Sequence, residues 1–173
     1  MAFVNSSFLE ALKSFDIPTC LRVCAGTDGS VTFLLEIMTR SEVSVITEDQ
    51  HLEPADVEMA MLLGAAEGSS VNHRTVMLVA GDVPYAHALS LSPLDRMPEG
   101  VKQDLMRADI PIGKILRTHG METRRDFETI QLEDGQDLFG CEHVLSRTYR
   151  IVYQNLTLMW IKESFPVDGR WNL

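Results

Sequence analysis

The sequence predicts an α+β fold, in which helices cover one face and one end of a central antiparallel sheet. Helical periodicity dominates the first part of the chain, and strand-like alternation dominates after residue 70. Several strand candidates also follow one another in hairpin order. A doubly wound parallel sheet is disfavoured because strands and helices do not alternate regularly. We expect the 173 residues to form a single domain spanning 1–173.

The first elements are predicted to be helices. Ser7 and Glu10 form a capping box at the start of a helix over 7–15, and Pro18 is expected to end that helix. Residues 28–30 open a second helix. Its apolar residues recur at helical spacing: Val31, Leu34, Leu35 and Met38.

The later elements are mostly strands. An alternating strand is expected over 42–47, and a weaker pattern indicates a helix over 56–66. Residues 71–80 and 84–91 then form a hairpin around Gly81-Asp82. Pro98 and Pro111 begin two further helices, ending at Arg107 and Gly120. Three long strands complete the prediction, at 121–132, 143–153 and 156–165, with Gln154-Asn155 as a tight turn between the last two.

Composition excludes several classes of function. Fifteen basic and 25 acidic residues give a net charge of -10, which disfavours nucleic acid and anionic membrane surfaces as partners. No apolar run reaches the ~20 residues that span a bilayer, and the first residues lack the basic segment of a signal peptide. The odd number of cysteines, three, favours a reducing, cytoplasmic location. We expect a small anionic substrate and a monomer or homodimer.

Metal-binding patterns are weak. Cys20 and Cys24 have a spacing that could hold a metal, but no second cysteine pair follows, so small buried apolar roles are favoured. Four histidines also lack metal-ligand spacing and are interpreted as structural: His73, His87, His119 and His143. No glycine-rich phosphate loop or serine nucleophile motif is present. The expected cofactor is none.

Two charged residues fall on apolar strand faces. Side chains at i, i+2 and i+4 share a face, so Glu163 lies on a stripe with Ile161 and Phe165. Arg74 likewise ends a stripe with Val76. An unpaired buried charge costs several kcal/mol, so each needs a partner or a ligand. One interpretation is a buried or edge Arg–Glu pair, or a strand end that reaches water. The other is a pocket in which Arg74 binds a carboxylate and Glu163 faces a hydroxyl or a proton.

A third segment favours the pocket. Residues 109–114 (DIPIGK) place free backbone N–H groups at a helix start, which suits an anion, and Gly113 allows close approach of a ligand. Basic residues surround this segment in the sequence: Lys114, Arg117, His119, Arg124 and Arg125. They are expected either to attract a small anion locally or to form a solvated face balanced by nearby acidic residues.

Three segments together resemble a known family. They are residues 74–84 (RTVMLVAGDVP), residues 110–116 (IPIGKIL) followed by 123–127 (TRRDF), and residues 161–166 (IKESFP). In this order they resemble the chorismate pyruvate-lyase (4-hydroxybenzoate synthase) superfamily. The closer likeness is to its archaeal and bacterial branch, formerly a domain of unknown function, and it covers residues 20 to 166.

The resemblance implies a central antiparallel sheet with helical flaps over a buried pocket. It implies that Arg74 binds a carboxylate with help from the backbone N–H of Ile112, and that Glu163 is the essential glutamate. The implied reaction eliminates pyruvate from chorismate to give 4-hydroxybenzoate without a cofactor. Glu163 either assists the departing proton or orients the ring. A non-catalytic small-acid sensor of the related effector-binding fold and an interaction module are the alternatives.

One position departs from the family. The enterobacterial type carries a Gly-Arg pair in the second hairpin strand, where this chain has Ala88-Leu89. A positive group is therefore missing, and His87, Lys114 or Arg125 is a candidate to replace it.

Overall fold

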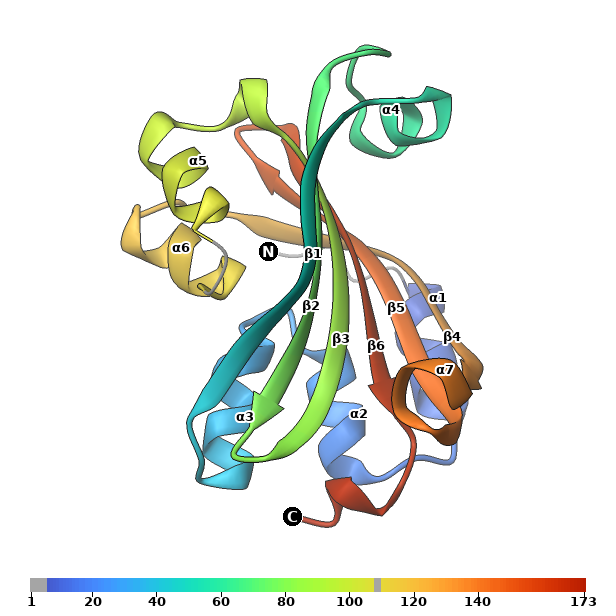
Figure 1. Ribbon diagram of the computed structural model, residues 1–173. Coiled ribbons are helices and arrows are strands. Elements are labelled where there is room, and N and C mark those ends of the chain that lie inside the picture. The colour runs from blue at the N-terminus through green and yellow to red at the C-terminus, as the bar shows by residue number, and fades with distance from the viewer. Residues whose placement is uncertain (1–5, 108–109) are drawn as a thin grey trace.

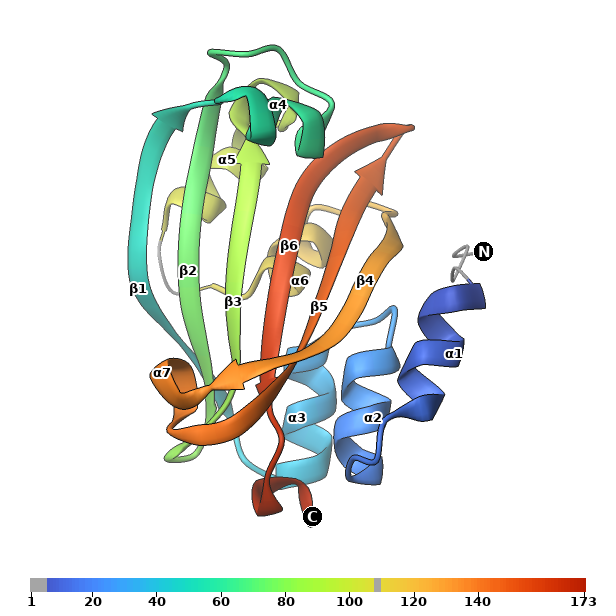
Figure 2. The ribbon, with the colours of Figure 1, turned by 90° about the vertical axis from the view of Figure 1, so that its right-hand side faces the viewer.

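A six-stranded antiparallel sheet forms the centre of the computed structural model, which describes residues 6–107 and 110–173 (Figures 1 and 2). The strands lie side by side in the order β1-β2-β3-β6-β5-β4. Their bounds are β1 Val43–Pro54, β2 Ser70–Ala80, β3 Val83–Pro93, β4 Arg124–Gly135, β5 Cys141–Tyr153 and β6 Leu156–Pro166. The predicted α+β class and antiparallel sheet are confirmed.

Most helices cover one face of this sheet. Figure 2 shows α5 and α6 behind the strands and α3, α2 and α1 side by side at the lower right, whereas α4 and α7 lie in front of the strands near opposite ends. The helices are α1 Ser6–Ser14, α2 Thr19–Gly26, α3 Val31–Thr39, α4 Val57–Leu63, α5 Glu99–Met106, α6 Ile112–Thr118 and α7 Gln136–Phe139, with 3-10 turns at Leu94–Arg96 and Gly169–Trp171. None of the described helices is long and apolar enough to cross a membrane.

Both predicted turns are confirmed by their backbone angles. Gln154 and Asn155 have φ values of 49° and 64°, the left-handed pair that a two-residue hairpin needs to match strand twist. Gly81 has a φ of 59° in the other turn. These turns set the register that aligns β2 with β3 and β5 with β6.

The prediction missed α2 and misplaced the role of Pro18. Pro18 lies at the start of α2 rather than at the end of α1, which already ends at Ser14. A proline suits the first turn of a helix because its missing N–H has no partner there. Leu21 and Cys24 of α2 are buried, so its apolar face contributes to the core.

Several boundaries also differ from the prediction. β1 extends to Pro54 rather than ending at Thr47, because a bulge between Thr47 and Asp49 breaks its alternation without ending the strand. The helix expected over 56–66 ends at Leu63, where Gly64 adopts a left-handed cap. β4 begins at Arg124 and runs beyond Leu132 to Gly135.

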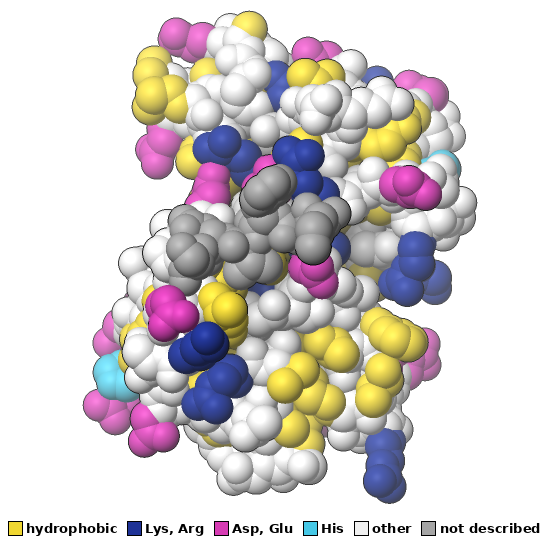
Figure 3. All heavy atoms as spheres, turned by 180° about the vertical axis from the view of Figure 1, so that it is seen from behind, with side chains coloured by type: hydrophobic (Ala, Val, Ile, Leu, Met, Phe, Trp, Pro, Cys, Tyr) yellow, Lys and Arg dark blue, Asp and Glu magenta, His cyan; other side chains and the backbone are white. Residues whose placement is uncertain are grey.

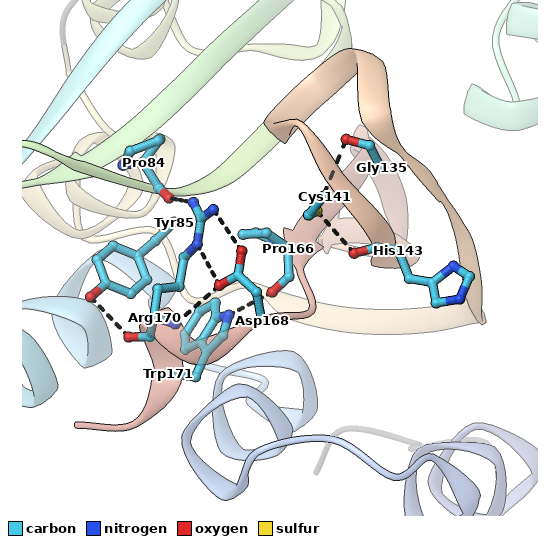
Figure 4. A network of polar contacts seen from close by, with 9 residues as sticks. All are labelled: Pro84, Tyr85, Gly135, Cys141, His143, Pro166, Asp168, Arg170 and Trp171. Atoms are coloured by element: carbon cyan, nitrogen blue, oxygen red, sulfur yellow. Dashed lines mark hydrogen bonds and ion pairs between the residues drawn. The ribbon is translucent and has the colours of Figure 1, made fainter.

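Hydrogen bonds and an ion pair hold the C-terminal segment, residues 168–171, against the sheet (Figure 4). Arg170 binds the Asp168 carboxylate with Nε at 2.8 Å and Nη2 at 2.7 Å, and also donates to the Pro84 carbonyl. The buried Trp171 indole donates to the Pro166 carbonyl at 2.7 Å and packs edge-on to Tyr85. This network closes one end of the main core, which joins the sheet to the helices on its covered face.

Candidate functional site

A cavity of about 60 Å³ lies on the helix-covered face, between the sheet and the starts of α3 and α6. A single water needs about 10–15 Å³ by this measure, so the space admits a larger guest. Its apolar wall is formed by Val45, Val76, Leu78, Ala88, Ile151 and Ile161. Its polar lining includes Ser30, Arg74, Ser90, Arg125, Tyr149 and Glu163.

Small side chains on β3 leave this space open. Ala88 pairs with Val76 on one side and Glu163 on the other, and Ser90 pairs with Arg74 and Ile161. Arg74 and Glu163 therefore lie in adjacent rows of one sheet face, separated by β3. Because strands are spaced by 4.7–4.9 Å, two spacings put β2 and β6 about 10 Å apart. The predicted convergence of these two charges on one cavity is therefore observed.

The Glu163 carboxylate is held by two side chains from β5. Arg147 contacts Glu163 Oε2 with Nε at 2.8 Å and Nη2 at 2.7 Å, and the Tyr149 hydroxyl donates to Oε1 at 3.1 Å. Glu163 is 6% exposed and Arg147 is fully buried. A carboxylate offers about four acceptor positions. Each oxygen accepts one hydrogen bond from these side chains, Oε2 from Arg147 Nε and Oε1 from Tyr149, so Oε1 keeps a second position for a guest in the cavity.

Arg147 is itself anchored to the chain that leads into α3. Its Nη1 donates to the carbonyls of Ala25 and Thr27 at 2.7 and 2.9 Å. Its guanidinium also lies 5.1 to 5.6 Å from the ring centres of Phe127, Tyr149 and Phe165. The end of α2 and the aromatic core thus fix the position of Glu163.

The buried charges influence one another's protonation. Burial works to lower the pKa of Arg147, but the Glu163 carboxylate together with Tyr149 and Cys24 more than offsets this, and the pKa lies above its usual value. Burial, followed by the charge of Glu163, raises the pKa of Tyr149, so this phenol stays protonated and donates. Burial raises the pKa of Cys24 to about 12, which makes this thiol unreactive.

Arg74 lies at a different edge of the cavity and is not the partner of Glu163. It is 2% exposed, and Nη1 and Nη2 each donate to the Ile110 carbonyl at 3.3 Å. The buried Arg–Glu pair that the sequence allowed does exist, but Arg147 supplies its guanidinium. Arg74 is thus tethered to the segment that leads into α6.

The start of α6 reaches the cavity with only part of the predicted segment. Ile112 and Gly113 line it, whereas Lys114 lies in an adjoining outer groove with Arg117. The Lys114 N–H is already bonded to the Pro111 carbonyl at 2.9 Å. Asp109, the first residue of the predicted segment, lies outside the described residues.

The predicted cluster of basic residues is dispersed. His119 contacts Asp104 at 2.8 Å, and Arg124 binds Asp126 through Nε at 2.7 Å. These exposed contacts match the solvated face that was the alternative interpretation. Of that predicted cluster, only Arg125 lines the cavity. The spacing in sequence did not reveal this because neighbouring strand residues point to opposite faces.

Of the three candidates for a replacement positive group, Arg125 is the one that lines the cavity, whereas Leu89 itself shares the opposite sheet face with His87. Arg125 Nη1 donates to the Asp28 carbonyl at 2.7 Å, and its guanidinium lies 5.9 Å from the Tyr149 ring centre. Its buried Nε has no hydrogen-bond partner among the described residues. His87 points to the opposite sheet face, where it contacts Glu48 at 3.1 Å.

Sequence reasoning missed Arg147 and Tyr149. Both lie on one face of β5 with Leu145 and Ile151, which is the same apolar-stripe signal that identified Arg74 and Glu163. The alternation of β5 in the sequence therefore already indicated that Arg147 and Tyr149 are buried.

Comparison with known proteins identifies the family. The family model of the Rv2949c-like chorismate pyruvate-lyases matches residues 26–172. The chain belongs to this family. A curated relative from Methanocaldococcus jannaschii, named "Putative lyase MJ0807", is 34% identical over 169 residues, covering 91% of this chain and 84% of that protein.

The chain shares its fold with solved structures of transcription regulators. The effector domain of PhnF from Mycobacterium smegmatis has a TM-score of 0.63 at 17% identity, covering 80% of this chain and 88% of that one. The C-terminal domain of the histidine utilization repressor from Pseudomonas syringae has a TM-score of 0.56 at 18% identity, covering 75% and 98%. These likenesses concern the fold, and the chorismate lyase-like architecture is consistent with them.

Proposed function

We propose that this protein is a chorismate pyruvate-lyase that eliminates pyruvate from chorismate and releases 4-hydroxybenzoate. The observation that carries the proposal is the arrangement of Arg74 and Glu163 at one cavity with an apolar wall between them. A carboxylated ring with a hydroxyl at its far end matches this arrangement. The family of the chain supports the same substrate.

In this proposal Arg74 and the Ile112 N–H hold the ring carboxylate. The fixed guanidinium and the uncapped helix start favour an anion at this end. Glu163 accepts a hydrogen bond from the ring hydroxyl through its remaining position on Oε1. Val76, Ala88 and Ile161 contact the ring faces and keep water away from them.

The chemical step breaks two bonds of the substrate. The ring carbon that carries the hydroxyl loses its hydrogen, and the neighbouring carbon loses the enolpyruvyl oxygen together with the bonding electron pair. The ring becomes aromatic, and the enolpyruvyl methylene gains a proton, so that pyruvate results. Aromatisation makes the reaction strongly downhill, and the protein mainly orients the substrate and stabilises the charge that moves to the leaving oxygen.

Arg125 is proposed to hold the second carboxylate, on the enolpyruvyl group. Its place in the cavity lining supports this role, as does its Nε, which has no hydrogen-bond partner among residues 6–107 and 110–173. Charge-assisted hydrogen bonds are the strong class of such contacts. Among the candidate replacements His87, Lys114 and Arg125, Arg125 is the one that lines the cavity.

The deciding experiment mixes purified protein with chorismate. Pyruvate is measured by a coupled lactate dehydrogenase assay, and the aromatic product is identified by chromatography against the three hydroxybenzoate isomers. Stoichiometric pyruvate and 4-hydroxybenzoate support the proposal. No turnover above the rate in buffer contradicts it.

A Glu163→Gln variant separates the two roles of this side chain. The amide oxygen still accepts a hydrogen bond, so a purely orienting role predicts similar losses in rate and in 4-hydroxybenzoate affinity. A proton-accepting role predicts a rate loss of about 10²- to 10⁴-fold with a smaller loss of affinity. Glu142→Gln, at an exposed β5 carboxylate, is the matched control and is expected to keep full activity.

The fold shared with regulator effector domains favours one alternative, a sensor that binds a small acid without chemistry. Calorimetry with chorismate and 4-hydroxybenzoate distinguishes it. Tight binding of chorismate with no pyruvate release would favour the sensor, whereas neither binding nor turnover would contradict both functions.

A further inference from the structure

We infer that the face of the sheet opposite the cavity carries a binding site for one divalent transition-metal ion, formed by His51, Glu53 and His73. One ligand atom from each of these three side chains lies within 4.8 Å of the others. His51 and His73 are directly paired across β1 and β2, and their ring centres are 4.9 Å apart. The histidines showed no metal-ligand spacing in the sequence because the site forms between two strands.

The hydrogen bonds of His51 prepare one imidazole nitrogen for a cation. Its Nδ1 lies 2.8 Å from the Asp49 carboxylate, and since an ionised carboxylate only accepts, Nδ1 carries the proton. In the neutral ring the lone pair is then on Nε2, which faces Glu53 Oε1 at 3.5 Å. Two acceptors that face each other repel unless a proton or a cation lies between them. A carboxylate behind a metal-binding histidine is a common second partner in metal sites.

His73 completes the set from the other strand. Its Nδ1 contacts the same Glu53 oxygen at 2.6 Å, so one carboxylate oxygen is shared by two imidazoles. A metal ion would replace the proton between His73 Nδ1 and Glu53, with that proton moving to Nε2 of the ring. Two imidazoles and one carboxylate with open positions for water suit Zn²⁺, Ni²⁺ or Cu²⁺ better than Mg²⁺ or Ca²⁺, which prefer oxygen ligands.

The site is accessible and separate from the cavity. The side chains of His51, Glu53 and His73 are 46%, 29% and 26% exposed, so a hydrated ion can reach them. His73 directly precedes Arg74 in β2, and consecutive strand residues point to opposite faces. The metal site therefore does not depend on the proposed lyase function.

Isothermal titration of tag-free protein with ZnCl₂ tests the inference. We expect one Zn²⁺ per chain, with His51→Ala and His73→Ala each weakening binding by at least about tenfold, and Asp49→Asn weakening it by about tenfold through its effect on His51. Circular dichroism checks that the variants keep their fold. His143→Ala removes an exposed histidine of β5 and should leave binding unchanged.

Two results would overturn the inference. The first is that the unaltered protein binds neither Zn²⁺ nor Ni²⁺ at one ion per chain. The other is binding that survives in the double variant His51→Ala/His73→Ala. Arg74→Ala, which should abolish carboxylate binding in the cavity, is expected to keep its Zn²⁺ affinity, so a failure of the lyase proposal is distinguishable from a failure of this one.

Discussion

At the scale of single residues, three arginines lie at the site, and each has a different observed or proposed carboxylate partner. Arg147 neutralises Glu163, while Arg74 and Arg125 line the same cavity and are the proposed partners of the two substrate carboxylates. Removing one partner of a buried ion pair is costly because the remaining charge stays out of water. Each of the three arginines therefore has a distinct expected phenotype.

Arg125→Gln is expected to raise the KM for chorismate by about 10- to 100-fold, the value of a charge-assisted hydrogen bond. The affinity for 4-hydroxybenzoate should change little, because this product lacks the enolpyruvyl carboxylate. Steady-state kinetics and product titration provide the comparison, and Arg124→Gln, the adjacent exposed arginine, is the control. Equal losses for substrate and product would contradict the proposed contact.

Arg147→Met is expected to lower the free energy of unfolding by about 3–5 kcal/mol, because Glu163 loses its counterion inside the protein. The double variant Arg147→Met/Glu163→Gln should recover part of this loss, although the hydrogen bonds to Ala25 and Thr27 remain absent. Urea denaturation at neutral pH gives the three values. A double variant that is no more stable than Arg147→Met would show that the ion pair is not the cause.

At the scale of elements, the start of α6 approaches the start of α3 closely enough to enclose the cavity. A Cβ atom added to Gly113 would lie 3.5 Å from the Ser30 hydroxyl, an ordinary contact, and its backbone is not in a left-handed conformation. The helix therefore tolerates a methyl group here, whereas a ligand bound to its N–H groups has less space.

Gly113→Ala is accordingly expected to leave the melting temperature within a few degrees of the unaltered protein while weakening 4-hydroxybenzoate binding. Thermal unfolding and calorimetry measure the two effects. Alanine has higher helix propensity than glycine, so a small gain in stability is also consistent. A large loss of stability with unchanged binding would show that Gly113 serves packing rather than ligand approach.

The strand pattern predicted the two buried charges that line the cavity but not their partners. Alternation placed Arg74 and Glu163 on buried faces, because that inference needs only the local period of a strand. Pairing Glu163 with Arg147 requires the order β3-β6-β5 and its register, which depend on the whole sheet. The helix α2 was missed although Leu21, Cys24 and Ala25 recur at helical spacing, because Pro18 was interpreted as the end of a helix rather than the start of one. The β1 bulge concealed the extension that carries His51.

At the scale of the whole molecule, the face seen from behind carries charges of both signs rather than a patch of one sign. Figure 3 shows acidic and basic side chains intermingled over the face seen from behind, with hydrophobic side chains over the lower half. Exposed apolar residues of α2 and α3 include Val23, Phe33 and Ile37. The overall charge of -10 would oppose an anion at long range, so the proposed substrate has to be attracted locally by the arginines of the cavity.

Global stability is expected to depend on pH through the C-terminal network. Hydrogen bonds from Arg170 hold the pKa of Asp168 below its usual value near 3.9. A lowered folded-state pKa stabilises the protein above about pH 4, and this contribution is lost as the pH falls through the folded value. Asp168→Asn should therefore lower the melting temperature at pH 7 but much less at pH 2.5. A difference that is the same at both pH values, or one matched by exposed Asp137→Asn, would refute this.

The anchoring of Arg147 to the carbonyls of Ala25 and Thr27 joins the first third of the chain to the Glu163 carboxylate. Deleting that third would therefore do more than expose the cavity to solvent. It would release the cation that steadies Glu163, and the six strands alone would present a misaligned acid. Shortened versions designed around the sheet should for this reason retain residues 19–39.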